Sequence, residues 1–142
     1  LCYSVFSYGT SYEDVGQLGV YAATSPEHTP ELIEVTSNVM MSMGEEVTAR
    51  EVDRAKAQLK ASLVMNLESA SSRANQIARQ YLAFGAVPEM STLVERISAV
   101  TPGDVKALAH GIFSGKPPSL SAVGQLSALE SHNKIAARFQ KG

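Results

Sequence analysis

Two alternating segments open the chain and helical patterns follow them, and this order constrains the fold more than any other feature of the sequence. Residues 1–8 and 17–24 each place apolar side chains at every second position, which is the period of a half-exposed β-strand. The stretch 9–14 between them is rich in Gly, Thr, Ser and Asp, which favour turns. We therefore predict an antiparallel hairpin.

The next hundred residues carry apolar side chains at helical spacing, interrupted by glycine and proline. The most sharply defined start is at Thr48, because Thr48 and Glu51 have the spacing of a capping box. The patterns predict helices over about 30–43, 48–66, 69–84, 93–97 and 102–114.

The sequence changes character after Lys116, where two prolines exclude a continuous helix. We predict that residues 120–123 return to the sheet as a strand and that a last helix covers about 126–139. The expected order is β-β-α-α-α-α-α-β-α. Strands segregated from a run of helices predict an α+β fold, with an antiparallel sheet and helices packed on one face. One domain over 1–142 accounts for every element, and because the first strand pattern is already under way at Leu1 we expect the natural protein to extend upstream.

Charge and hydropathy argue against two classes of partner. The 142 residues carry 12 Lys and Arg against 14 Asp and Glu, a formal charge of −2, without a basic cluster that would bind a phosphate backbone. No apolar run approaches the ~18 residues of a membrane-spanning helix. We expect neither a nucleic-acid partner nor a membrane span.

The histidines do not form a metal motif. His28, His110 and His132 are far apart in the sequence. His28 and Glu31 reproduce the first half of the inverted zinc motif H-x-x-E-H, but the second histidine is replaced by Leu32. We expect no metal ligand in this chain.

Three further patterns have structural explanations. The single cysteine, Cys2, is interpreted as a small buried hydrophobe on a strand, because a nucleophile needs a nearby histidine. Ser131 and Lys134 match S-x-x-K, which here is interpreted as a solvated helix end. Gly16 and Gly19 lie in or beside a strand, where glycine indicates a close backbone approach or a bulge.

Two blocks of sequence resemble a known family. The first is LCYSV at 1–5 with SYEDVGQLGVY at 11–21, and the second is TAREVDRAKAQLK at 48–60 with LES at 67–69 and YLAFG at 81–85. Both resemble the C-terminal domain of the zinc peptidases typified by pitrilysin, insulin-degrading enzyme and mitochondrial processing peptidase, with the processing-peptidase branch most similar.

This resemblance implies a metallohydrolase half-clamshell domain that closes over a peptide or presequence substrate. The zinc ion and its H-x-x-E-H motif would belong to an N-terminal domain or subunit outside this chain, so the fragment alone would be inactive. Some family members divide these parts between two subunits, which makes a dimer one of the arrangements implied. The resemblance places such a protein in the bacterial cytoplasm or periplasm, or in the mitochondrial matrix.

The resemblance also implies one catalytic residue here. Active members supply an arginine and, seven residues later, a tyrosine, and Tyr3 falls on the tyrosine position while the arginine would lie upstream of Leu1. A phenol held ~3 Å from the oxygen of the reacting carbonyl stabilises the charge that develops there. The alternative is an aromatic side chain that covers the core, the interpretation preferred for Tyr8, Tyr12 and Tyr21.

Three functions are compatible with the sequence patterns and the resemblance. The first is the substrate-chamber domain of a zinc metalloendopeptidase, and the second is a non-catalytic scaffold or partner subunit of the same fold. The third is an unrelated α+β binding module, which a structure without this arrangement of sheet and helices would favour.

Overall fold

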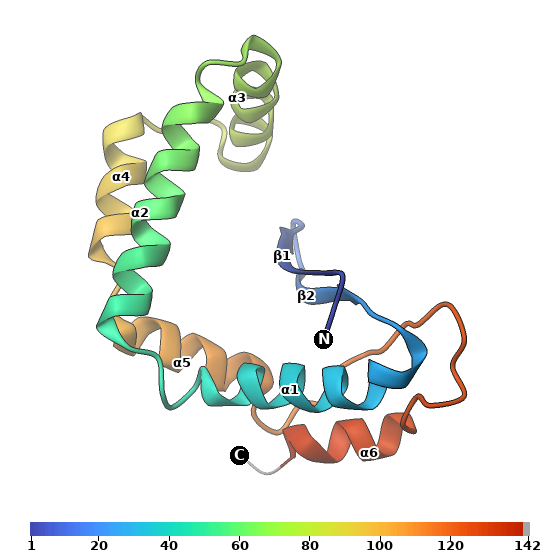
Figure 1. The fold of residues 1–142 in the computed structure, drawn as a ribbon. Helices are drawn as coiled ribbons and strands as arrows, with labels where there is room; N and C mark the ends of the chain where they lie inside the picture. The colour runs from blue at the N-terminus through green and yellow to red at the C-terminus, as the bar shows by residue number, and fades with distance from the viewer. Residues whose placement is uncertain (141–142) are drawn as a thin grey trace. The chain divides into compact units, whose positions relative to one another are not determined.

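The computed structural model describes residues 1–140, which divide into two compact units (Figure 1). Unit 1 consists of Leu1–Glu46 together with the chain from Lys106 onward, and unit 2 is Val47–Val105. That the two units make up one domain stays a prediction.

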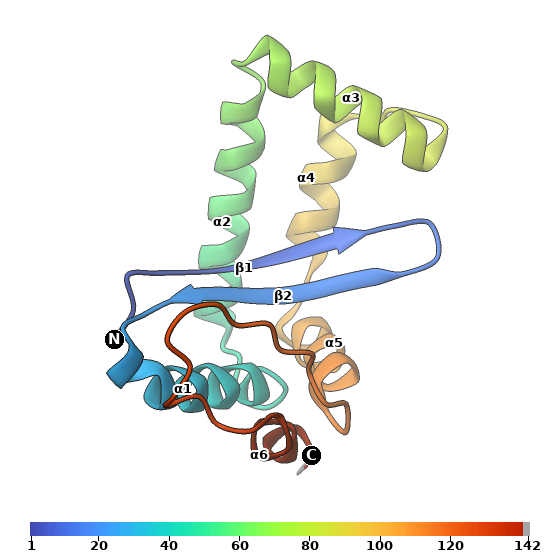
Figure 2. The same ribbon diagram turned by 90° about the vertical axis from the view of Figure 1, so that its right-hand side faces the viewer.

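Unit 1 begins with the expected hairpin. Strands β1 (Ser4–Ser11) and β2 (Gly16–Ala23) pair antiparallel from Ser4 opposite Ala23 to Ser11 opposite Gly16. Figure 2 shows the two strands running side by side along their whole length. Because every second side chain in each strand points to the same face, this register decides which residues of the two strands meet.

One face of the hairpin is aromatic. Phe6 lies directly opposite Tyr21, and their rings stack with centroids 5.0 Å apart. Tyr8 lies opposite Gly19, where an added Cβ would come within 2.4 Å of the Tyr8 ring. Gly19 is therefore the close approach that the sequence indicates, since only a residue without a side chain leaves room for the ring.

The core of unit 1 lies between helices that are far apart in sequence. Helix α1 (Thr29–Ser42) follows the short 3₁₀ helix η1 (Pro26–His28), and α5 (Pro102–Phe113) enters the unit at Lys106. Helix α6 (His132–Ala136) and the 3₁₀ helix η2 (Ala137–Phe139) complete it. The buried cluster joins α5 to α6 and η2, with side chains of α1 packed against it: Ala109, Phe113, Ile135, Phe139, Ile33, Met40 and Met41.

The prediction for the C-terminal quarter is partly wrong. Residues 120–123 form no strand in the described chain, and Val123 is fully exposed. A strand needs the backbone of a neighbour to pair with, and these residues have none. The last helix begins at His132 and not at 126, so residues 116–131 cross the surface of unit 1 without regular structure apart from turns.

Unit 2 consists of α2 (Ala49–Asn66), α3 (Ala70–Phe84) and α4 (Met90–Ala99). The capping box that begins α2 is present as predicted: the Thr48 hydroxyl accepts from the Glu51 backbone N–H at 3.3 Å, and the Glu51 carboxylate accepts from the Thr48 backbone N–H at 2.9 Å. Helix α3 ends at Gly85, whose φ of 68° is the left-handed conformation that favours glycine.

The apolar stripe of α2 is less buried than expected. Val52 is buried, but Leu59 and Leu67 remain exposed among the described residues. Lys56, expected to lie in water, is half-buried and donates from Nζ to the Ser98 carbonyl near the end of α4 at 3.0 Å. A charged side chain thus helps to hold α2 and α4 together.

The α+β class is confirmed, with a two-stranded antiparallel sheet and six α-helices among the described residues. Its observed order lacks the predicted returning strand. None of the described helices combines the length and the apolar character needed to cross a membrane.

Candidate functional site

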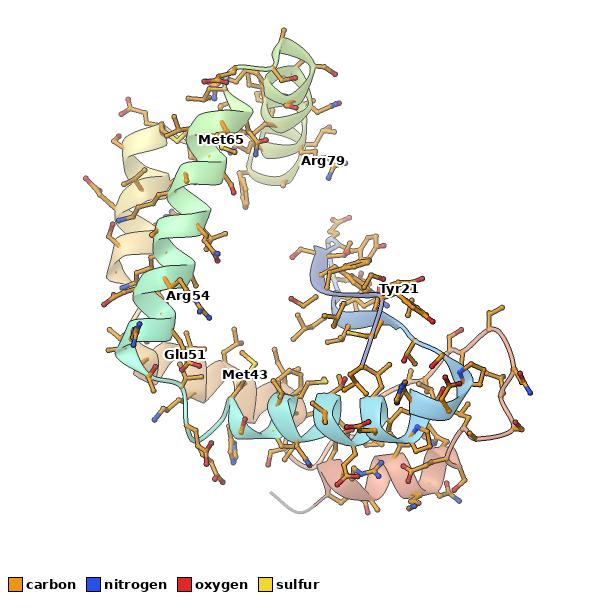
Figure 3. The ribbon with its side chains drawn as sticks, viewed as in Figure 1. Tyr21, Met43, Glu51, Arg54, Met65 and Arg79 are labelled. Atoms are coloured by element: carbon orange, nitrogen blue, oxygen red, sulfur yellow. The ribbon has the colours of Figure 1, made fainter. Side chains whose placement is uncertain are left out.

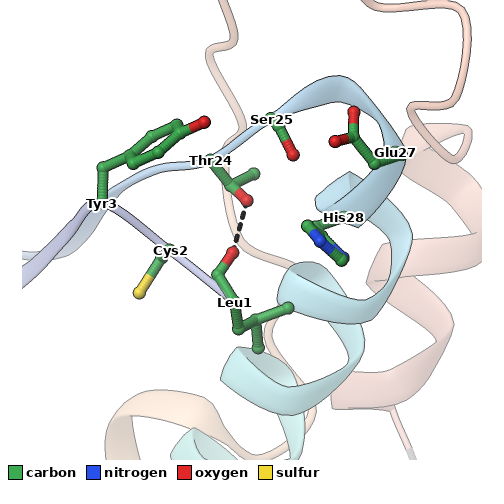
Figure 4. A pocket seen from close by; sticks show the side chains of 7 residues that line it. All are labelled: Leu1, Cys2, Tyr3, Thr24, Ser25, Glu27 and His28. Atoms are coloured by element: carbon green, nitrogen blue, oxygen red, sulfur yellow. Dashed lines mark hydrogen bonds between the residues drawn. The ribbon is translucent and has the colours of Figure 1, made fainter.

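Tyr3 lies one residue before β1, beside the segment that leads from β2 into η1. Its side chain is 82% exposed, and it lines a hollow of about 270 Å³. Figure 4 shows the seven residues around this hollow, which come from the two ends of the hairpin and the start of η1: Leu1, Cys2, Tyr3, Thr24, Ser25, Glu27 and His28. We refer to it as the Tyr3 hollow.

Hydrogen bonds to the last residue of β2 and to the residue after it hold the backbone on both sides of Cys2. The Tyr3 N–H donates to the Ala23 carbonyl at 2.7 Å, and the Thr24 hydroxyl donates to the Leu1 carbonyl at 2.5 Å (Figure 4). The first bond extends the pairing of the hairpin beyond its last regular pair. The chain that carries Tyr3 is thereby tied to the segment opposite it.

The polar side of the Tyr3 hollow is negatively charged. Hydrogen bonds from the Glu27 backbone N–H and from the Ser25 hydroxyl hold the pKa of Glu27 below its ordinary value. His28 lies close to a second carboxylate, with 3.6 Å between its Nδ1 and Oε2 of Glu31. The carboxylate of Glu27 therefore stays ionised to a lower pH than an unperturbed glutamate does.

The described residues do not fit a zinc ion. No three His, Cys, Asp or Glu side chains come together anywhere in residues 1–140. Cys2, Glu27 and His28 all line the Tyr3 hollow, but Figure 4 shows the Cys2 sulfur directed away from His28. A protein zinc site needs at least three such ligands around one point, so no step of catalysis is assigned to a metal held by this chain.

Some of the candidate residues predicted from the sequence line the Tyr3 hollow, and others lie elsewhere in the structure. Tyr3, Cys2 and His28 come together, and Cys2 is exposed, so the expectation that it is buried is wrong. It lies before β1 begins, where no neighbouring strand covers it. His132 is engaged elsewhere in unit 1, with its Nε2 2.8 Å from the Pro118 carbonyl oxygen.

Sequence reasoning missed Thr24, Ser25 and Glu27 as neighbours of Tyr3. The hairpin pattern contained a signal, because continuing the register of β1 and β2 past the pair Ser4 and Ala23 brings the residues after Ala23 beside those before Ser4. The turn into η1 then brings Glu27 to the same place.

A second hollow, of about 310 Å³, lies at the start of α2 in unit 2, lined by Arg50, Glu51 and Arg54. Figure 3 shows Glu51 and Arg54 on successive turns of this helix. Bonds from the Thr48 hydroxyl and its backbone N–H hold the pKa of Glu51 below its ordinary value. These long side chains belong to a helix start and bring no reactive group together.

Comparison with known proteins shows what this chain is similar to. Residues 1–59 match the family model described as the peptidase M16 inactive domain. Over 140 residues the chain is 34% identical to an uncharacterised zinc protease of Streptomyces coelicolor, covering 96% of this chain and 30% of that protein. It is 36% identical over 135 residues to the mitochondrial-processing peptidase subunit alpha of Rattus norvegicus, covering 95% and 26%.

Two more comparisons extend this picture. The mitochondrial-processing peptidase subunit beta of Bos taurus is 29% identical over 140 residues, covering 99% of this chain and 29% of that protein. A chain in the structure of complex III2 from Candida albicans, bound to Inz-5, superposes with a TM-score of 0.87 at 23% identity, over 95% of this chain and 33% of that one. This likeness shows a shared fold, and the present chain spans between a quarter and a third of each of these proteins.

Proposed function

This chain belongs to the M16 peptidase family as part of its C-terminal, inactive domain, and from that premise we propose that it forms a wall of the substrate chamber of a zinc metalloendopeptidase. In this proposal the chain supplies Tyr3 as a hydrogen-bond donor to the substrate and supplies no zinc ligand. The substrate is a peptide or presequence, and a zinc-bearing domain or subunit is the partner. The relatives include a mitochondrial peptidase and a protease of Streptomyces, so both predicted compartments, mitochondrial and bacterial, stay in the proposal.

The observation that carries this proposal is the exposure of Tyr3. An aromatic side chain that covers a core loses most of its accessible surface, whereas that of Tyr3 is 82% exposed. Its backbone is tied down by the Ala23 carbonyl while its ring projects from the chain (Figure 4). A held backbone and an exposed phenol are what a donor to an external substrate requires.

The chemistry asked of Tyr3 is simple. When a nucleophile adds to a peptide carbonyl, negative charge develops on the carbonyl oxygen, and an O–H aimed at that oxygen binds the transition state more tightly than the substrate. The phenol keeps its proton and orients a hydrogen bond. Removing it therefore lowers kcat and changes KM little.

The test is Tyr3→Phe in the full-length protein, with cleavage of a peptide substrate followed at steady state. We expect kcat to fall by about 10²- to 10³-fold, the usual cost of one such donor, with KM nearly unchanged. Tyr12→Phe is the matched control, because Tyr12 is an exposed tyrosine at the far end of the same hairpin. An unchanged kcat in Tyr3→Phe removes this residue from the mechanism.

The second candidate is a non-catalytic scaffold or partner subunit, favoured by the match to a domain described as inactive. The two candidates differ in the residue seven positions before Tyr3 in the full-length protein. An arginine there favours catalysis, and its absence favours the scaffold. Loss of peptide cleavage on replacing that arginine would be the functional counterpart of the Tyr3 test.

A further inference from the structure

We propose that Thr24 is the positioning residue for Tyr3, a role that rests on the proposed function of the phenol. Thr24 is half-buried and its hydroxyl donates to the carbonyl of Leu1, two residues before Tyr3. It does not take part in the reaction itself. Its role is to fix the direction in which the chain enters β1, and with it the direction of the exposed ring.

The need for such a residue follows from the register of the hairpin. The last regular pair is Ser4 with Ala23, and continuing the same register places Leu1 opposite Pro26. Hydrogen-bonded pairs alternate along an antiparallel ladder, and the bond from the Tyr12 N–H to the Val15 carbonyl places Ser4 with Ala23 among them, so Leu1 and Pro26 fall at a position where the regular ladder gives the Leu1 carbonyl no backbone donor. The Thr24 hydroxyl supplies the donor that the backbone lacks at this point.

The pairing is already irregular at Tyr3. By register Tyr3 lies opposite Thr24, at a position where a regular ladder makes no backbone hydrogen bonds, yet its N–H donates to the Ala23 carbonyl. The ladder therefore cannot hold this segment by regular repetition. The two bonds to Ala23 and Thr24 are the ones the structure provides on either side of Cys2.

The direction of the Tyr3 side chain depends on the two hydrogen bonds that hold its backbone. Its ring is exposed and takes no part in the stacking between Phe6 and Tyr21 or in the contact between Phe6 and Tyr8. Its direction is consequently set by the backbone that carries it. A misplacement of about 1 Å at a reacting group can cost on the order of 10²-fold in rate, so a frayed segment is expected to impair a donor that is chemically intact.

The experiment compares Thr24→Val with Thr24→Ser in the full-length protein. Valine keeps the shape of threonine and removes the hydroxyl, whereas serine keeps the hydroxyl. We expect Thr24→Val to lower kcat by about 10-fold with KM nearly unchanged, within the range that misplacement costs, and Thr24→Ser to retain most of the activity. Unchanged kcat in Thr24→Val overturns the inference, as does an equal loss in both variants.

A double-variant cycle separates positioning from a general structural effect. In a protein that already carries Tyr3→Phe, Thr24→Val should lower kcat no further, because no phenol is left to position. A further 10-fold loss in the double variant would show that Thr24 acts independently of Tyr3 and would overturn the inference.

A failure of the proposed function of Tyr3 can be distinguished from a failure of the inference about Thr24. If Tyr3→Phe alone leaves kcat unchanged, the catalytic role of Tyr3 is lost, and the role of Thr24 is then decided by amide hydrogen exchange at Tyr3. Faster exchange of this amide in Thr24→Val than in Thr24→Ser supports Thr24 as the residue that holds the segment. Equal exchange in the two variants overturns that as well.

Discussion

The two units of this chain are stabilised in different ways. Of the six buried apolar side chains among the described residues, five belong to unit 1, and Val52 alone belongs to unit 2. The core of unit 1 joins helix α1 to α6 and η2, which lie about a hundred residues later, whereas α2 and α3 of unit 2 begin at local side-chain caps. A segment can therefore form well-defined helices without a buried apolar core of its own.

Both units have exposed apolar residues among the described residues, and in unit 2 these include residues of α2 and α3. Leu59 on α2, and Tyr81 and Leu82 on α3, keep much of their surface accessible among the described residues. The polar side chains of Gln76 and Gln80 are less exposed than these apolar neighbours. Helix α3 therefore forms by local signals even though its apolar side is not buried by the described residues.

The largest expected effect tests whether unit 1 has the dominant core. Phe139 is 2% exposed in the cluster between α5 and η2, and Phe139→Ala should lower the free energy of unfolding by about 3–5 kcal/mol, the usual cost of a buried phenylalanine. Leu82→Ala on α3 is the matched control, since Leu82 is 85% exposed and its loss should cost less than about 0.5 kcal/mol.

Urea unfolding of the full-length protein measures both changes. A loss at Leu82 as large as that at Phe139 would break the comparison, because it would show that the apolar side of α3 is buried in the full-length protein.

A smaller effect tests whether local bonds define unit 2. Thr48→Ala removes the hydroxyl that caps α2 and should destabilise this helix by about 1 kcal/mol. Thr48→Ser keeps the cap and serves as the control. Amide hydrogen exchange should be faster in the first turn of α2 and unchanged in α6. Equally faster exchange in α6 would mean that the two units unfold together, and the comparison would then fail.

The smallest effect concerns the two ion pairs of Glu130 in unit 1, of which the one to Lys134 is screened by water and salt because the Lys134 side chain is 67% exposed. Glu130 bonds to Arg138 at 2.6 Å and to Lys134 at 2.5 Å, and these bonds, with that of Arg138 the stronger influence, lower the pKa of Glu130 to about 2. Since its folded-state pKa lies below the unfolded value of 4.5, the carboxylate stabilises the fold above about pH 4.5, and this contribution is lost as the pH falls towards 2.

The pH dependence of unfolding between pH 6 and 2 measures this contribution. Glu130→Gln should flatten the curve in that range, and Arg138→Gln should flatten it more than Lys134→Gln does. Equal curves for Arg138→Gln and Lys134→Gln would contradict the order of the two influences.

The elements that sequence predicted best are those whose signals are local. The hairpin followed from alternation, the start of α2 from Thr48 and Glu51, and the end of α3 from Gly85. In each case the residues that decide the structure lie within a few positions of one another, so the chain itself brings them into contact. For Gly19 the sequence indicates either a close approach or a bulge, and the structure decides between them by placing the Tyr8 ring against this glycine.

The sequence predicts only part of the candidate site. Tyr3 was proposed from a resemblance, and its catalytic role stays a prediction. Its neighbours Thr24 and Glu27 lie more than twenty positions away, and they reach it because the hairpin folds back and η1 then turns. The alternation of apolar and polar residues predicts the strands but not the residues at which they end. The Tyr3 hollow is formed at the start of β1 and the end of β2.

The sequence by itself determined the α+β class, the hairpin, and the five helices from α1 to α5, because strand alternation, caps and helix stops act over a few residues. Only the tertiary structure decided that residues 120–123 form no strand, that the last helix begins at His132, and that Cys2 is exposed. A strand, a buried cysteine and a core each depend on whether a distant part of the chain arrives to pair with them or cover them. Backbone pairing and burial are interactions between segments, so the pattern within one segment cannot specify its partner.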